Sequence, residues 1–96
     1  MKPPFFKFRL YVADHTQNSR EAIGNLSALC KEYVPGRHAI EVIDVFKSPK
    51  RALDDGILMT PTLLKLAPAP APIRIVGTLS QTLPVLQALG LHAAIE

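Results

Sequence analysis

Hydrophobic residues change their spacing twice within the first 46 residues, and this change restricts the fold more than any other feature. In residues 5–13 the apolar side chains recur at every second position, which is typical of a strand with one buried face. Residues 39–46 form a nearly continuous apolar and β-branched run, which favours a strand buried on both faces of a parallel sheet. With a helix of about 16 residues between them, the pattern predicts a strand–helix–strand unit with a right-handed crossover.

The helix of this unit has a recognisable start and end. Asn18 is a suitable N-cap, and Glu21, three residues later, can complete a capping box. The helix then runs to about Val34, and Pro35-Gly36 terminates it. Its apolar residues fall on one face and are Ala22, Ile23, Leu26, Leu29, Cys30 and Tyr33.

The second half of the chain predicts a short helix, two strands and a last helix. The expected ranges are about 49–55 for the short helix, 62–67 and 73–76 for the strands, and about Leu83 through Ala94 for the last helix. Ser48-Pro49 starts the short helix and Gly56 ends it. Residues 67–72, APAPAP, form an extended and stiff connector. Pro84 is tolerable because it lies in the first turn of the last helix.

The order of these elements, βαβ followed by α and then ββα, is that of the thioredoxin-like α/β fold. We expect a mixed sheet in which the final hairpin runs antiparallel to the first two strands. Because 96 residues leave little room for a second core, residues 1–96 are expected to form one domain.

The redox chemistry usual for this fold has no support in the sequence. A reactive thiol would lie at the N-terminus of the first helix, where the helix dipole lowers its pKa. The corresponding stretch here is Thr16-Gln17-Asn18-Ser19, and Thr60-Pro61 takes the place of the cis-proline that faces it. The single cysteine, Cys30, lies well along the helix on its apolar face and is expected in the core. One buried thiol cannot carry out a dithiol reaction.

Other catalytic and metal-binding groups also lack the arrangement that their chemistry needs. Ser19 is read as a helix-capping residue, because a serine nucleophile needs an oriented base and only His15 beside Asp14 is near. Asp54-Asp55 is expected to be solvated, since adjacent helical side chains point in different directions. The glycines are too far apart to form a phosphate loop. No metal-ligand spacing joins the histidines, which are His15, His38 and His92. The sequence therefore predicts no catalysis, cofactor or metal.

Charge and hydropathy exclude further classes. Eleven Lys and Arg stand against eight Asp and Glu, which gives a net charge of +3, and only Lys47, Lys50 and Arg51 cluster. A nucleic-acid binder usually has a denser basic stripe with stacking aromatics. No apolar run approaches the ~20 residues that span a bilayer, and no secretory signal is visible. With a single cysteine, a reducing cytoplasm is the expected compartment.

Several motifs along the chain resemble those of the KaiB family. In the first half they are Lys7-x-Arg9-Leu10-Tyr11-Val12-Ala13, Thr16-x-Asn18-Ser19 and Val42-Ile43-Asp44-Val45. In the second half they are Pro49, Ala52, Asp55 and Ile57, then Thr60-Pro61-Thr62-Leu63 with Lys65, the proline-rich stretch, and Gly77 with Leu79 and Ser80. The resemblance covers about residues 7–91, and the sensor domain of the clock histidine kinase SasA is the most easily confused relative.

The resemblance implies a binding protein and not an enzyme. KaiB proteins of cyanobacteria dock onto the N-terminal ATPase ring of the hexameric kinase KaiC, recruit KaiA and displace SasA, which favours KaiC dephosphorylation. The implied residues for KaiC-type docking are Lys50, Arg51, Leu58, Thr60, Pro61 and Arg74. The edge strand that would pair with a KaiA-like partner contains Ile40, Glu41 and Val42.

The resemblance also implies a fold switch and self-association as a dimer or tetramer. KaiB proteins are metamorphic: one form, often a tetramer, has the order βαββααβ, and the binding form is thioredoxin-like. Segments 57–67 and 83–95 suit such a switch because their helix and strand preferences are ambiguous, and two packings need differ by only a few kcal/mol. Slow X-Pro isomerisation is expected to set the exchange rate, at Pro61 first and then at Pro68, Pro70 and Pro72.

Departures from the family pattern bear on the switch and on the partners. Ala88 stands where the family usually has Gly, which favours the thioredoxin-like form by about 1 kcal/mol, and Gly90 offsets part of this. Gly56 replaces a Lys that contributes to KaiC docking, and Glu41 replaces a frequent Lys of the edge strand. The resemblance thus implies a clock adaptor or a KaiB homologue outside the clock, for example in the stress response. A thioredoxin-fold redox protein or chaperone is the alternative class.

Overall fold

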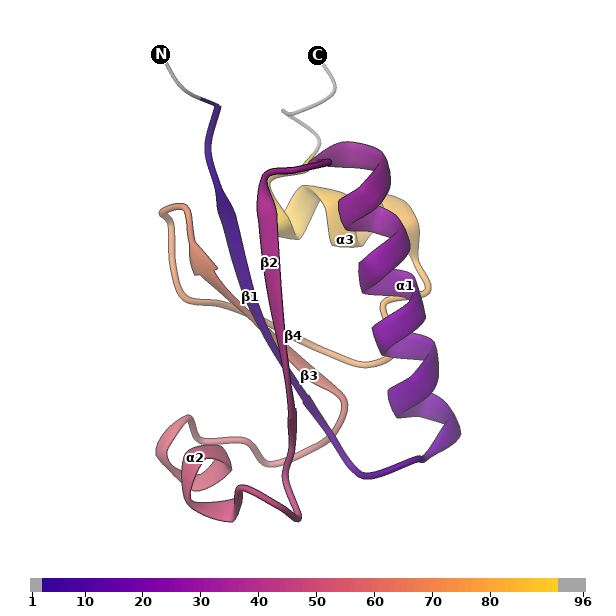
Figure 1. Cartoon of the computed structure of the whole chain (residues 1–96), viewed down its shortest axis with the longest axis vertical. Coiled ribbons are helices and arrows are strands. Elements are labelled where there is room, and N and C mark those ends of the chain that lie inside the picture. The colour runs from indigo at the N-terminus through magenta and orange to yellow at the C-terminus, as the bar shows by residue number, and fades with distance from the viewer. Residues whose placement is uncertain (1–2, 92–96) are drawn as a thin grey trace.

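The computed structural model describes residues 3–91 and contains a four-stranded sheet with helices on both faces (Figure 1). Its elements are β1 (Phe6–Val12), α1 (Gln17–Tyr33), β2 (His38–Asp44), α2 (Pro49–Asp54), β3 (Thr62–Ala67), β4 (Ile73–Val76) and α3 (Thr82–Leu89). These are the elements that the sequence predicts, in the predicted order, and the fold is thioredoxin-like. The alternative order βαββααβ is not the one observed.

The sheet is mixed and has the strand order β2-β1-β3-β4. β1 pairs in parallel with β2, as the strand–helix–strand unit predicts, and antiparallel with β3. β4 is antiparallel to β3 and therefore runs in the same direction as β1. The expectation that both strands of the hairpin oppose the first two was thus right for β3 and wrong for β4, because two adjacent antiparallel strands cannot both oppose a third.

The first helix begins two residues earlier than the capping pattern suggests. Thr16 is the N-cap, with extended φ and ψ of −62° and 151°, and its hydroxyl oxygen accepts a hydrogen bond from the Ser19 N–H at 3.3 Å. Asn18 lies inside the first turn, and the Glu21 carboxylate accepts a hydrogen bond from the Gln17 side chain at 3.2 Å. The prediction of an Asn18 N-cap was wrong because Thr and Asn both suit this position, and the register of the buried face decides between them.

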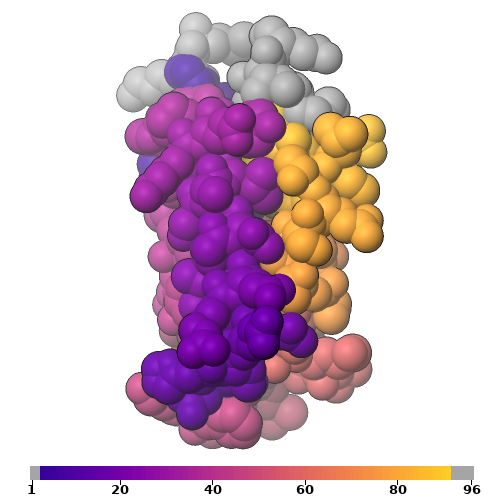
Figure 2. All heavy atoms as spheres, turned by 90° about the vertical axis from the view of Figure 1, so that its right-hand side faces the viewer, coloured from indigo at the N-terminus to yellow at the C-terminus, as the bar shows by residue number. Residues whose placement is uncertain are grey.

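The main core lies between the sheet and the helices α1 and α3. Phe6, Phe8, Leu10 and Val12 of β1 are buried, as their alternation predicts, and they pack against the apolar faces of both helices. Figure 2 shows the side chains of α1 lying alongside the C-terminal segment that contains α3. The two helices therefore cover the centre of this face, while Ile40, Ile73 and Ile75 towards its edges are partly buried.

A smaller core lies on the opposite face of the sheet, under α2. Tyr11, Ile43, Ala52 and Leu64 are buried there together. Tyr11 belongs to the polar half of the β1 alternation, yet it is 0% exposed because α2 crosses over it. Each face of the sheet thus has its own apolar layer.

The second strand is less buried than its composition suggests. β2 lies at the edge of the sheet, and within it only Ile43 is fully buried, while Val42 is 44% exposed. The prediction of a strand buried on both faces was wrong because the central position belongs to β1, with strands on both sides of it. An apolar run cannot report which strand takes the centre.

The segments around α3 also differ in detail from the predictions. Residues 68–70 form a bend rather than an extended connector, because β3 and β4 are antiparallel neighbours, and the peptide bonds before Pro68, Pro70 and Pro72 are cis.

α3 ends at Leu89, and Gly90 caps it in the left-handed region with φ of 76°. Gly90 therefore terminates the helix and is not a weak residue inside it. The expected continuation through Ala93-Ala94 lies outside the described residues, as do His92 and Glu96. None of the helices in residues 3–91 is long and apolar enough to cross a membrane.

Candidate partner-docking surface

The position of a thioredoxin-like thiol is occupied by Ser19, which lies in the first turn of α1. The prediction that Ser19 caps the helix was wrong, because Thr16 takes the N-cap position. Ser19 is 0% exposed, and its hydroxyl oxygen accepts hydrogen bonds from the Ala13 N–H at 3.0 Å and from the Thr16 hydroxyl at 2.8 Å. The Thr60-Pro61 peptide bond is cis, as its place in the fold predicts. The scaffold of a redox site is thus present with a structural residue in place of the nucleophile.

The only thiol in the chain is remote from that position and inert. Cys30 is 0% exposed within the main core, as predicted, and burial raises its pKa to about 11. Since the thiolate is the reactive species, a buried thiol with a raised pKa is a poor nucleophile. Among residues 3–91, no group of three or more His, Cys, Asp and Glu side chains could hold a metal ion.

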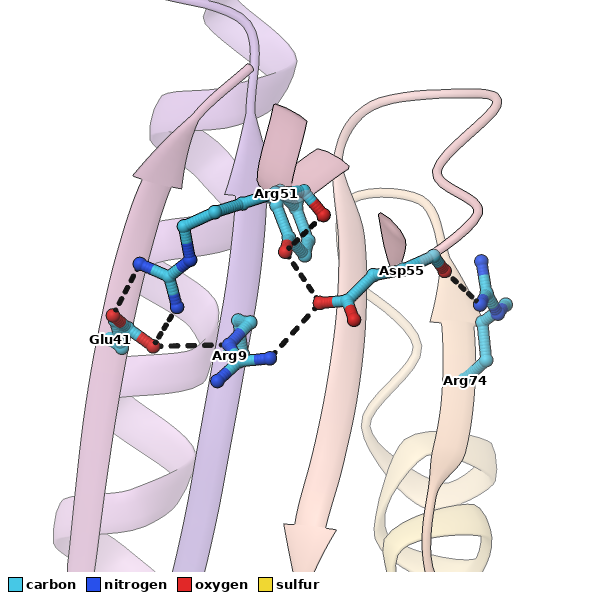
Figure 3. Close-up of polar contacts among 6 residues, drawn as sticks. Arg9, Glu41, Arg51, Asp55 and Arg74 are labelled. Carbon is cyan, nitrogen blue, oxygen red and sulfur yellow. Dashed lines mark hydrogen bonds and ion pairs between the residues drawn. The ribbon is translucent and has the colours of Figure 1, made fainter. Parts of the chain in front are cut away.

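A network of charged side chains connects the edge strand, the central strand and α2 (Figure 3). Arg51 of α2 forms a bidentate pair with Glu41 of β2, with N–O distances of 2.9 and 3.1 Å. Arg9 of β1 donates from Nε to Glu41 and from Nη1 to Asp55, both at 3.0 Å. The Tyr11 hydroxyl donates to the Asp55 carboxylate and lies 3.1 Å from the Arg51 carbonyl oxygen. Side chains from three elements are thereby held in one arrangement.

The network lowers the pKa values of its two carboxyl groups and raises that of the Tyr11 hydroxyl. Hydrogen bonds from Arg51 and then Arg9 lower the pKa of Glu41 to about 2. The pKa of Asp55 is lowered mainly by the hydrogen bond from Tyr11. Desolvation partly opposes this shift, and the hydrogen bond from Arg9 adds to it. Burial, together with the Asp55 carboxylate, raises the pKa of Tyr11 to about 12. Both carboxylates are therefore ionised at neutral pH.

The structure assigns different surroundings to the three cations of the predicted KaiC-type surface. Arg51 is tied to Glu41, so the two predicted surfaces share one ion pair. Arg74 of β4 donates to the backbone carbonyl oxygens of Gly56 at 3.0 Å and of Asp55 at 2.6 Å, and thus fastens the end of α2 to the sheet (Figure 3). The Lys50 side chain is 90% exposed, and its Nζ is no closer than 4.0 Å to the Asp54 carboxylate. Arg51 and Arg74 are exposed as well, but within residues 3–91 Lys50 is the one of these three cations whose side chain makes no hydrogen bond.

The apolar part of the predicted surface forms a groove beside α2, at the lower end of the molecule in Figure 1. Its volume is about 260 Å³, and it is lined by Phe46, Leu58, Met59 and Thr60, among others. Leu58 is 94% exposed, Phe46 72% and Met59 64%. Pro61, which follows Thr60, is buried and positions this turn. Large apolar side chains so exposed on neighbouring segments indicate a protein-binding site.

We call Phe46, Leu58 and Met59 the α2 groove. Phe46 and Met59 were missed by the sequence analysis, because an apolar residue next to a strand is normally read as core. The missed members of the ion network are Arg9, Tyr11 and Asp55. Asp55 was expected to be solvated, but its side chain is only 28% exposed and bonded twice. The one available signal was the motif resemblance, which includes Arg9, Tyr11 and Asp55 without giving them a role.

The predicted second surface is an open sheet edge. Because β2 pairs only with β1 among residues 3–91, one side of its backbone carries no neighbouring strand from this part of the chain. Ile40 is half-buried against the main core, whereas Glu41 and Val42 are exposed. Such an edge can accept an additional strand from a partner.

Comparison with known proteins decides the family. The model of the KaiB domain matches residues 9–91, which is nearly all of the described chain. The chain belongs to the KaiB family. This KaiB-family chain is 40% identical over 81 residues to circadian clock protein KaiB3 of Synechocystis sp., covering 84% of this chain and 78% of that protein. It is 46% identical over 83 residues to circadian clock oscillator protein KaiB of Prochlorococcus marinus, covering 86% of this chain and 77% of the relative.

Solved structures place the KaiB-family chain in the thioredoxin-like fold. The N-terminal domain of Synechococcus elongatus SasA superposes with a TM-score of 0.73 at 19% identity, covering 94% of this chain and 88% of that one. Chloroplastic thioredoxin z superposes with a TM-score of 0.74 at 18% identity, covering 93% and 80%. At such low identity these likenesses describe the backbone arrangement alone.

Proposed function

We propose that this KaiB-family chain is a cytoplasmic, non-enzymatic clock adaptor. It binds the N-terminal ATPase ring of a KaiC-type hexameric kinase and changes the kinase's phosphorylation state. The observation that carries the proposal is the α2 groove, an exposed apolar surface on a chain whose curated relatives are circadian clock proteins. The buried and hydrogen-bonded position of Ser19 and the buried Cys30 support binding over catalysis.

The docking surface in this proposal combines apolar shape with one exposed charge, on Lys50, that no hydrogen bond within residues 3–91 holds in place. Leu58, Thr60 and the Pro61 turn provide the shape, and Lys50 provides the charge for an acidic partner surface. Arg51 and Arg74 act indirectly, because their contacts with Glu41 and with the end of α2 hold the groove in place. Most of the affinity is therefore expected from the apolar side chains, in line with the small contribution of solvated ion pairs.

The remaining partners follow from the same fold. A SasA-type kinase competes for the KaiC-type ring, and the backbone likeness to the SasA N-terminal domain supports a shared docking mode. A KaiA-like partner would add a strand along Ile40, Glu41 and Val42 of the open β2 edge. Glu41 there is neutralised by Arg9 and Arg51, so pairing would use the backbone rather than this charge.

The proposal includes a fold switch in the second half. The thioredoxin-like form is the binding form, and the alternative βαββααβ form self-associates as a dimer or tetramer. Ala88 lies within α3 and Gly90 caps it, so both residues favour the helix. Pro61, Pro68, Pro70 and Pro72 lie in the segments that would have to repack.

The test is co-elution of the chain with a KaiC-type hexamer after long incubation with ATP. We expect Leu58→Glu to weaken binding at least tenfold, because it places a charge in the α2 groove. The matched control is Phe5→Glu, since Phe5 is also an exposed apolar residue (47%) but precedes the start of β1, whereas the groove adjoins Ala13 at the other end of that strand. Failure of the unmodified chain to bind would contradict the proposal, and equal loss in both variants would contradict the assigned surface.

A further inference from the structure

A charged side chain is buried in the main core and has no part in the docking surface. Lys65 of β3 is 2% exposed, on the sheet face that α1 and α3 cover. Its Nζ donates to the backbone carbonyl oxygen of Leu89 at 3.3 Å, at the last residue of α3. Lysine is almost never so deeply buried unless it is paired, and this contact joins the sheet to the C-terminal end of the helix.

The surroundings of this ammonium group are apolar. Its cross-strand partners are Phe8 in β1 and Ile73 in β4. The titratable side chains that α1 contributes to the same core are Cys30 and Tyr33, and α3 contributes apolar residues. Within residues 3–91, Lys65 forms no salt bridge. Desolvation is accordingly what lowers the pKa of Lys65 below its ordinary value of 10.5.

The segment that carries α3 is held to the rest of the molecule by few polar contacts. Asn25 of α1 donates to the Thr78 carbonyl oxygen at 2.8 Å, before the helix. Leu79 lies in the left-handed region with φ of 64°, which is unfavourable for a side chain other than glycine. The hydrogen bond from Lys65 to the Leu89 carbonyl oxygen lies at the C-terminal end of α3. Opening of α3 would relieve the Leu79 backbone and expose the lysine to water.

We propose that the buried charge of Lys65 destabilises the docking of α3 on the sheet, so that deprotonation of Lys65 strengthens this docking. A cation near a helix C-terminus interacts favourably with the terminal carbonyl groups, but the cost of removing an ammonium from water is larger in an apolar site. Opening of α3 returns the ammonium group to water, so the charged form of Lys65 favours the opened state. The inference does not depend on the identity of any partner.

The direction of the pH dependence follows from the lowered pKa. Below the pKa of the docked state, Lys65 is charged in both the docked and the opened forms, and the full penalty favours opening. As the pH rises from that pKa towards 10.5, the docked form loses its proton first and docking strengthens. Above 10.5 both forms are neutral and the penalty is absent.

The first test is native-state hydrogen exchange of the Leu86 and Leu89 amides in Lys65→Met, a neutral residue of similar length. We expect at least tenfold greater protection at pH 7 than in the unmodified chain. The control is Lys31→Met, which removes a lysine near the solvated C-terminus of α1 and should leave these amides unchanged. Lower or unchanged protection in Lys65→Met would overturn the proposal. An increase in protection confined to the Leu10 amide of β1 would also overturn it, because the lysine would then stay buried when α3 opens.

The second test needs no variant. The side-chain carbon and proton shifts of Lys65, followed by NMR between pH 7 and 11.5, are expected to titrate below the ordinary value of 10.5. A midpoint at or above this value would mean that the Leu89 contact outweighs desolvation. The ammonium would then clamp α3 shut, which is the opposite of the proposal.

Discussion

Tyr11 connects the central strand to α2 through a single hydroxyl group. Because the ring is fully buried and the hydroxyl donates to the ionised Asp55, Tyr11→Phe removes a hydrogen bond to a charged group without creating a cavity. We expect the free energy of unfolding in urea to fall by about 1–2 kcal/mol. Tyr33→Phe is the matched control, since the Tyr33 hydroxyl makes no hydrogen bond within the described chain, and it should cost only a few tenths. Equal losses in the two variants would remove the assigned role of Asp55.

Glu41 makes the stability of the molecule depend on acidic pH. Its pKa is lowered to about 2 in the folded state by Arg51 and then Arg9, so its contribution is present above the ordinary value of 4.5. That contribution is lost as the pH falls from about 4.5 to about 2. Urea midpoints measured over this range should fall less steeply for Glu41→Gln than for the unmodified chain. Asp54→Asn, which changes an exposed carboxylate of α2, should keep the original slope.

At the scale of the element, a glycine inside one helix and a glycine that caps another are expected to respond to alanine in opposite directions. Gly24 lies inside α1 with open space around its missing side chain, so Gly24→Ala should stabilise the fold by up to about 1 kcal/mol. Gly90 caps α3 with φ of 76°, so Gly90→Ala should cost about 1 kcal/mol. Thermal unfolding of both variants measures the difference. Stabilisation by Gly90→Ala would mean that α3 continues through this position instead of ending there.

At the scale of the whole molecule, a thioredoxin-like backbone without an accessible thiol should show no thiol–disulfide exchange. We expect the chain to leave insulin unreduced in the presence of dithiothreitol beyond the background rate. Cys30→Ser should not change that result or the binding of a KaiC-type hexamer, because Cys30 is buried in the core. Insulin reduction that disappears in Cys30→Ser would place the chain among redox proteins.

The sequence by itself determined the elements, because each has a local physical cause. Alternation in β1, helical spacing in α1 and the Pro61 boundary before β3 were sufficient to place seven helices and strands. The motifs likewise indicated the family, whereas the docking roles of Leu58 and Lys50 stay predictions. Local signals were ambiguous only where two residues suited one role, as with Thr16 and Asn18 at the N-cap.

Only the tertiary structure decided which residues meet. Strand order placed β2 at the edge, brought Glu41 beside Arg9, and buried Tyr11 under α2. The same packing left Phe46 and Met59 exposed and put the Lys65 ammonium against the end of α3. Periodicity describes one segment at a time, whereas burial, ion pairing and exposed apolar grooves depend on contacts between segments far apart in the chain.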